Sequence, residues 1–113
     1  MRTNFNIENT DTIDTLAYRE QTKMMILQIA DGMDWSDMER HFSLLREKLD
    51  TYIWYIDSKQ YEDKYPDVER IELRVTFLFK EPDVCIKLLE KAGEVLHRVF
   101  ENSALIVECG ERE

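Results

Sequence analysis

Hydrophobic positions along the chain follow two periods, and the period of two residues predicts four strands. Met24–Ala30 is a nearly continuous apolar run, typical of a well-buried strand, and we expect the shorter segment Ile13–Tyr18 to pair with it as a hairpin. In Ile71–Phe79 apolar residues occupy alternate positions, so one face of this strand packs and the other is mostly hydrated. A last strand is predicted at Ala104–Glu108.

Two other segments have apolar residues at three- and four-residue spacings, the period of a helix packed on one side. The first begins at about Asp37, where Ser36 and Glu39 fit a capping box, and charged residues such as Lys48 lie mostly off its apolar stripe. The second follows Pro82, whose missing N–H suits a first helical turn. The first stripe is Met38, Phe42, Leu45, Leu49, Tyr52, Ile53 and Ile56, and the second is Cys85, Leu88, Leu89, Ala92, Val95, Leu96, Val99 and Phe100.

The element order is therefore β-β-α-β-α-β, with a turn at Asp31-Gly32 and a charged irregular connection at Asp57–Asp67. Two crossovers that each contain a helix place both helices on the same face of one sheet. We expect an α+β two-layer sandwich with one mixed four-stranded sheet. Residues 1–12 are predicted to form a flexible N-terminal arm, residues 13–109 a single domain, and residues 110–113 a charged tail.

Charge narrows the classes of partner. Of 113 residues, 24 are acidic and 15 are Lys or Arg, and the net charge of −9 disfavours nucleic acids and anionic membranes but permits a basic protein. No apolar run is long enough to span a membrane. Cys85 and Cys109 lie far apart and no signal-peptide pattern is present, so we expect a cytoplasmic protein.

Residues that could carry chemistry are few. Asp31, Asp34 and Asp37 could offer carboxylates to Ca²⁺ or Mg²⁺, but turn formation and the charge preference of a helix start account for all three, and they stay weak candidates. His41 and His97 are interpreted as partly exposed helix residues. No nucleophile, dinucleotide, phosphate or zinc signature is present, so we expect no cofactor and name no catalytic residue.

Aromatic residues give a more informative signal, with two readings. Tyr and Trp are favoured at interfaces, and Trp54 and Tyr55 fall partly off the apolar stripe, which suggests a partner-binding surface. The alternative is that the group packs in the core or under the charged loop. The candidates for partner binding are Trp35, Trp54, Tyr55, Tyr61 and Tyr65.

The run Asp31-Gly32-Met33-Asp34-Trp35, followed by Leu44-Leu45-Arg46-Glu47-Lys48-Leu49, resembles a small bacterial family of uncharacterised domains. In that family a D-x-x-D-W element precedes a Leu-Leu-x-Glu-Lys helix. The resemblance covers nearly the whole chain after the N-terminal arm and implies a bacterial or phage-borne cytoplasmic protein. It brings no activity with it.

The sequence does not determine the function, and three hypotheses remain. The first is a non-enzymatic protein-interaction module, immunity-like or an adaptor, whose acidic surface binds a basic partner. The second is a small metal-dependent or hydrolytic enzyme with a non-standard site, using Asp31, Asp34 and Asp37, or His41 with nearby acids. The third is a homodimer formed through strand edges or through the uncovered sheet face.

Overall fold

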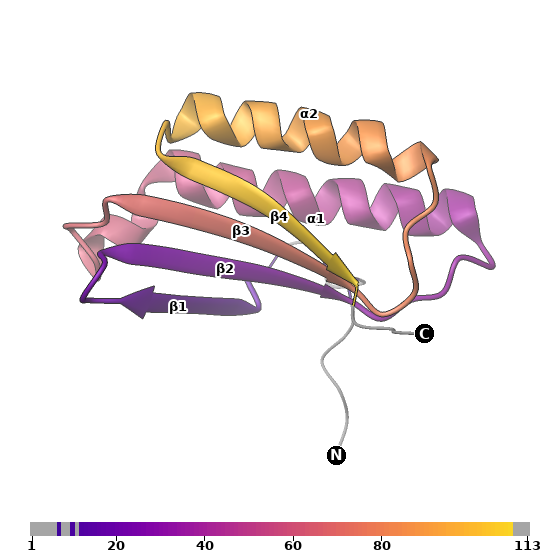
Figure 1. The fold of residues 1–113 in the computed structure, drawn as a ribbon, viewed down its shortest axis with the longest axis horizontal. Coiled ribbons are helices and arrows are strands. Elements are labelled where there is room, and N and C mark those ends of the chain that lie inside the picture. The colour runs from indigo at the N-terminus through magenta and orange to yellow at the C-terminus, as the bar shows by residue number, and fades with distance from the viewer. Residues whose placement is uncertain (1–6, 8–9, 11, 110–113) are drawn as a thin grey trace, which may run out of the picture.

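The computed structural model describes residue 7, residue 10 and residues 12–109, and it is a two-layer sandwich (Figure 1). One layer is a four-stranded sheet, and the other contains both helices, which lie on the same face of that sheet. The predicted architecture and element order are confirmed. The elements are β1 (Thr15–Arg19), β2 (Met24–Asp31), α1 (Met38–Ser58), the 3₁₀ helix η1 (Gln60–Asp63), β3 (Arg70–Phe77), α2 (Val84–Val99) and β4 (Ser103–Cys109).

The strands lie in the order of the sequence, β1-β2-β3-β4. β1 pairs with β2 as an antiparallel hairpin, whereas β2, β3 and β4 are mutually parallel. Each parallel step contains one helix, and both steps move in the same direction across the sheet. The carboxyl ends of three strands therefore meet at one edge of the sandwich, where Asp31, Phe77 and Cys109 are neighbours in register.

The helix-facing side of the sheet forms the core because apolar residues alternate along the two central strands. This core is completely buried at its strand positions, and the alternate positions, polar along β3 and mostly apolar along β2, point the other way. The buried strand residues are Met25, Leu27, Ile29, Ile71, Leu73, Val75 and Phe77.

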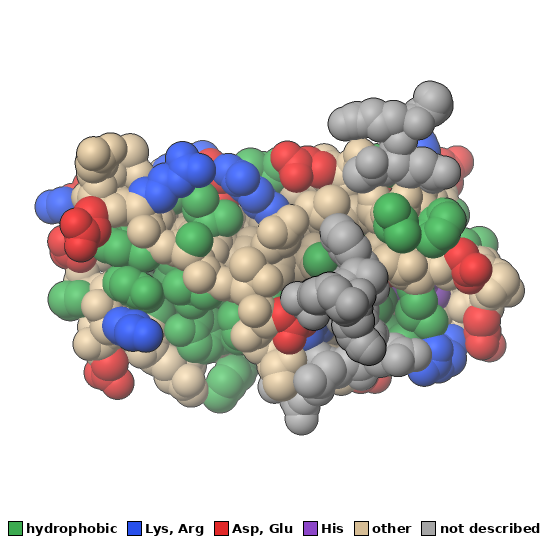
Figure 2. Space-filling model, turned by 90° about the horizontal axis from the view of Figure 1, so that it is seen from below, with side chains coloured by type: hydrophobic (Ala, Val, Ile, Leu, Met, Phe, Trp, Pro, Cys, Tyr) green, Lys and Arg blue, Asp and Glu red, His purple; other side chains and the backbone are tan. Residues whose placement is uncertain are grey.

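The opposite face of the sheet is polar and internally paired along β3. The carboxylate of Glu72 lies 2.8 Å from the guanidinium of Arg74 and 3.6 Å from that of Arg70. The Gln28 side-chain amide donates to the Thr76 hydroxyl at 2.9 Å. Figure 2 shows this face, on which hydrophobic side chains gather toward one end among charged ones. Paired polar groups explain why this face needs no second layer of helices.

The apolar residues through which this face could form a dimer are mostly buried. Met24 and Ile26 are each 9% exposed, and in register Met24 is flanked by Arg19 and Arg70. Leu78 is 38% exposed, but it lies beyond the end of β3. A dimer through the open face is therefore less favoured than one through a strand edge.

The start of α1 differs in detail from the predicted capping box. The N-cap is Asp37, whose carboxylate accepts the N–H of Arg40 at 3.3 Å, while the Ser36 hydroxyl donates to Asp34 at 2.7 Å. Ser36 pairs with Asp34 instead because a carboxylate two residues away competes for its hydroxyl. Met38, which the stripe placed in the core, is 43% exposed because it begins the helix at the end of the sandwich.

The connection after α1 is ordered by aromatic packing. α1 ends at Ser58 and is capped by Lys59, a residue with a left-handed backbone (φ 61°), and η1 follows at once. The ring of Tyr65 stacks on that of Tyr18 at 4.6 Å, and the Tyr18 hydroxyl donates to Asp67 at 2.8 Å. This hydrogen bond and the partial burial of the ring raise the pKa of Tyr18 to about 12, with burial the larger cause.

The described positions of the N-terminal segment contact the domain. Ile7 is completely buried in the core, and the carbonyl of Thr10 accepts the hydroxyl of Thr51. The other residues of the predicted arm, and the predicted tail at 110–113, lie outside the described residues. Within the described part of the chain, no helix is long and apolar enough to cross a membrane.

Candidate functional site

The carboxyl ends of the parallel strands hold a buried acid–base pair. Asp31 ends β2, and one of its carboxylate oxygens, Oδ2, lies 2.5 Å from Nε2 of His41 on α1. Both side chains are 0% exposed. The other oxygen, Oδ1, accepts the N–H of Met33 at 3.0 Å, and the Trp35 indole stacks on the imidazole with centroids 3.5 Å apart. His41 was interpreted as partly exposed, and that was wrong because Trp35 covers the ring.

The surroundings of His41 determine how many protons the pair holds. Nδ1 lies 2.8 Å from the carbonyl oxygen of Asp34, which can only accept, so Nδ1 carries a proton. A second proton must then lie between Nε2 and the carboxylate of Asp31, since two facing lone pairs would repel each other. The pair therefore exists either as imidazolium with carboxylate or as neutral imidazole with carboxylic acid. Burial raises the pKa of the Asp31 carboxyl, while its hydrogen bonds to His41 and Met33 oppose that shift.

Each of the three carboxylates considered for metal binding has a different hydrogen-bond partner. Asp31 faces His41, Asp34 accepts from the hydroxyl and the N–H of Ser36, and Asp37 caps α1. The hydrogen bonds from Ser36 lower the pKa of Asp34. Within residues 12–109 and the described positions before them, no group of three or more His, Cys, Asp or Glu side chains is arranged to hold a metal ion.

The burial of Asp31 and His41 counts against the enzyme hypothesis that uses His41 with nearby acids. The structure brings Asp31 and His41 together, but neither side chain has surface that a substrate could contact. Cys85, at the start of α2, is also buried, and burial together with the charges of Glu81 and Asp31 raises its pKa to about 11. A protonated thiol is a poor nucleophile.

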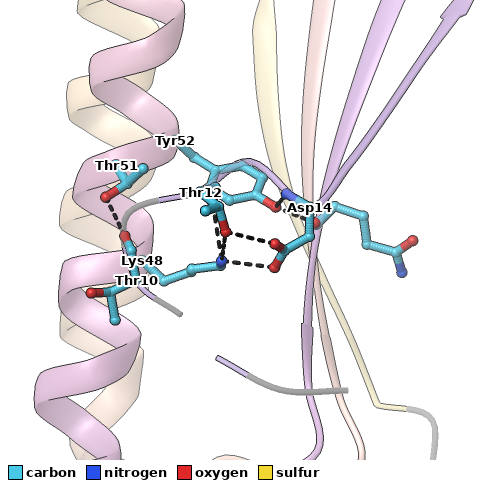
Figure 3. A network of polar contacts seen from close by, with 7 residues as sticks. Thr10, Thr12, Asp14, Lys48, Thr51 and Tyr52 are labelled. Atoms are coloured by element: carbon cyan, nitrogen blue, oxygen red, sulfur yellow. Dashed lines mark hydrogen bonds and ion pairs between the residues drawn. The ribbon is translucent and has the colours of Figure 1, made fainter. Parts of the chain in front are cut away.

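A second buried polar cluster lies about two turns further along α1 (Figure 3). The Lys48 ammonium is 0% exposed and lies 2.7 Å from the carboxylate of Asp14, and it donates to the carbonyl oxygen of Thr12 at 3.0 Å. The N–H of Asp14 donates to the Tyr52 hydroxyl, which itself donates to the carbonyl of Gln28 on β2 at 2.7 Å. These contacts hold the segment before β1 against α1 and against the sheet.

Lys48 was missed because a lysine counts as a surface residue in a hydropathy pattern. The signal that could have found it is positional. His41, Leu45, Lys48 and Tyr52 follow each other at spacings of three and four residues, and all four are buried. A polar residue that occupies a stripe position is therefore a candidate buried anchor.

The aromatic candidates divide between the two readings. Tyr61 is 2% exposed, so it packs under the loop and offers a partner no surface. Tyr55 is half-buried with its ring 6.3 Å from that of Tyr61, and Tyr65 is half-buried on Tyr18. Trp35 is held by His41 and donates its indole N–H to the carbonyl of Phe79 at 3.2 Å. Trp54, by contrast, is 60% exposed.

On the outer face of α1, exposed carboxylates lie on both the amino-terminal and the carboxyl-terminal side of Trp54. Asp50 precedes it by four residues and Asp57 follows it by three, so both neighbour Trp54 on the helix surface, and Glu47 lies about two turns before it on the same side. All three acids are exposed. The last turn of α1 contains no basic residue, although a cation there would be favoured by the helix dipole. We call Glu47, Asp50, Trp54 and Asp57 the Trp54 face.

Comparison with known proteins identifies the family but no activity. A protein-family model described as "Family of unknown function (DUF6572)" matches residues 5–106, and the chain belongs to this family. No curated protein and no solved structure matches the chain.

Proposed function

We propose that this member of a family of unknown function is a binding module for a basic protein, and that it binds through the Trp54 face. The observation that carries the proposal is the 60% exposure of Trp54 on a helix where two of its surface neighbours, Asp50 and Asp57, are carboxylates. A large aromatic side chain held on a rigid helix loses little conformational entropy on binding.

The chemistry of the face indicates a partner with lysine or arginine at the point of contact. A Lys or Arg side chain laid over the indole gains a cation–π interaction. Its charge can also form an ion pair with the carboxylate of Asp50 or Asp57, which lie within about one turn of Trp54. The net charge of −9 adds long-range attraction for a basic protein. The second candidate function, catalysis at Asp31 and His41, has no comparable support because both side chains are buried and have no surface that a substrate could contact.

The test is capture of a partner from a host lysate by the tagged chain, first at low and then at high salt, followed by measurement of the affinity. We expect a basic protein that is released by salt. Trp54→Ala should weaken its binding by at least about 2 kcal/mol, roughly thirtyfold in Kd, because an aromatic anchor is lost. Asp50→Asn and Asp57→Asn should each weaken it by roughly two- to fivefold.

The matched control is Glu101→Gln, which removes an exposed carboxylate outside the Trp54 face. It should leave Kd close to the wild-type value. A partner whose affinity is the same at low and high salt, or that binds the Trp54→Ala variant as tightly as the wild type, would disprove the proposal.

A further inference from the structure

The two edges of the sheet are protected to different degrees. β1, at one edge, has only five residues, and Arg19 at its end is exposed. β4, at the other edge, has seven residues, Ser-Ala-Leu-Ile-Val-Glu-Cys, with a single charged residue and no proline or lysine. Natural proteins block strand edges with charges, proline or short length, and β4 uses none of these along its middle.

An apolar groove follows the β4 edge beneath α2. It has a volume of about 330 Å³ and is lined by Ile86, Leu89, Gly93, Leu105 and Val107, with Glu81 and Glu90 also in its wall. Ile86 is 45% exposed and Val107 is 37% exposed. At the far end of α2 the hollow continues between Glu94, His97, Arg98 and Ser103. The Ser103 hydroxyl there is buried and has no hydrogen-bond partner within the described part of the chain.

We propose that β4 pairs with β4 of a second copy of this chain in an antiparallel, two-fold symmetric manner, so that the two sheets become one. The sequence of β4 is complementary to itself in this register. When Ile106 lies opposite its own counterpart, Leu105 faces Val107 on the helix side and Ala104 faces Glu108 on the open side. No like charges face each other along the strand, and apolar pairs occupy its centre.

The charges along α2 fit the same symmetry. Glu81 lines the groove near the start of α2, and Arg98 lines the adjoining hollow at the end of α2, where Glu94 partly offsets its charge. A two-fold axis near Ile106 reverses the second groove, so the Arg98 end of each copy approaches the Glu81 end of the other. Glu90 lies between these ends and meets its own counterpart near the axis, which weakens the dimer. A symmetric dimer is also the commonest assembly of soluble proteins.

The salt response separates this dimer from the proposed partner binding. Two copies of charge −9 repel each other at long range, so salt strengthens the dimer, whereas it weakens capture of a basic partner. The dimer rests on β4 and the partner site on α1, so either one could fail alone.

The experiment is sedimentation velocity of the full chain over a wide range of concentrations at low and high salt. We expect the particle to change from 13.6 kDa to twice that mass as the concentration rises. Ile106→Lys places two ammonium groups opposite each other at the axis and should leave only the 13.6 kDa species. Glu90→Gln should tighten the dimer by roughly two- to fivefold, because a like-charge pair is removed.

The matched control is Ala17→Lys, the same new charge on the open face of the other edge strand, which should leave the dimer intact. A wild-type chain that stays at 13.6 kDa at every concentration and salt would overturn the proposal, as would equal effects of the two lysine variants. If Ile106→Lys does not fold, hydrogen exchange of the wild type decides. Amides of β4 should become more protected as concentration rises, and unchanged protection would refute the pairing.

Discussion

Two buried ion-pairing clusters lie on the same face of α1, and they differ in how far water reaches them. His41 and Asp31 are both 0% exposed, whereas Lys48 is 0% exposed and its partner Asp14 is 35% exposed. His41 connects α1 to the end of a central strand. Lys48 connects α1 to the segment before the edge strand β1.

The difference shows what each cluster contributes. A sealed pair cannot replace a lost partner with water, so each member depends on the other for its solvation. Asp14 keeps part of its hydration and can turn to water when the ammonium is removed. We therefore expect the His41 cluster to determine whether the domain folds, and the Lys48 cluster to determine how firmly the chain before β1 is held.

The largest expected effect is that of His41→Ala. Removing the imidazole leaves the buried carboxyl of Asp31 without its partner and creates a cavity beneath Trp35. The free energy of unfolding should fall by about 3–5 kcal/mol, measured by urea denaturation at neutral pH.

Asp31→Asn is the matched control for that experiment. An amide oxygen can still accept the N–H of Met33, and the amide NH₂ can donate to Nε2 of a neutral His41, so both contacts survive. This variant should cost only about 1 kcal/mol. Equal losses for the two variants would mean that a neutral amide cannot replace the carboxyl, and that the pair depends on the proton or the charge that Asp31 and His41 share.

The same two clusters mark the limit of prediction from the sequence. The apolar periods predict the four strands, the two α-helices and their order, because each of these elements buries one apolar face and local spacing reveals that face. They do not predict η1, which lies in the segment expected to be irregular. Lys48 and His41 were placed at the surface because a pattern that counts apolar residues assigns every charged group to water. Their partners, Asp14 and Asp31, come from other elements, so no local pattern reveals them.

Other features depend on contacts between distant segments. Trp35 was one of the candidates for partner binding, with packing as the alternative, and the sequence did not show that its indole N–H reaches the carbonyl of Phe79, which is 44 residues away. The strand order was also not predictable, because a helical crossover can step toward either side of a strand. Trp54, on the other hand, was recognisable from its position partly off the apolar stripe, and its exposure agrees with that position.

The second expected effect is a fall in stability at alkaline pH, and its sign follows from the sealed pair. The hydrogen bonds of His41 place a proton between its Nε2 and the carboxylate of Asp31 in the folded chain, and burial, which raises the pKa of Asp31 above its ordinary 3.8, acts in the same direction. In the unfolded chain an ordinary imidazole takes up one proton until about pH 6.5, and the two states then hold equal numbers. Above that pH the folded chain holds one proton more, so its stability falls as pH rises, by at most about 1.4 kcal/mol per pH unit.

Groups around the pair add little slope of their own over this range. The pKa of Asp34 is lowered, so this group stays ionised in both states over the range. The pKa of Cys85 is raised from 9.0 to about 11, so its thiol adds only a small fall in stability near about pH 8.5, and it adds this fall equally to both chains compared below. The measurement is urea unfolding across this range for the wild type and for Asp31→Asn, whose stability should lack the fall that the pair causes. A wild-type curve parallel to that of the variant would show that the pair takes up no proton on folding.

The smallest expected effect is that of Lys48→Met, which tests the hydrated cluster. Methionine keeps the apolar stem of the lysine side chain in place but leaves the carbonyl of Thr12 without this donor and Asp14 without its cation. The free energy of unfolding should fall by about 1–2 kcal/mol, less than for His41→Ala, because Asp14 is already partly hydrated. In hydrogen exchange the amide of Asp14 and those of β1 should lose protection, while the amides of β3 keep theirs. A loss as large as that of His41→Ala would show that the exposure of Asp14 does not relieve the cost, and that the two clusters contribute equally to folding.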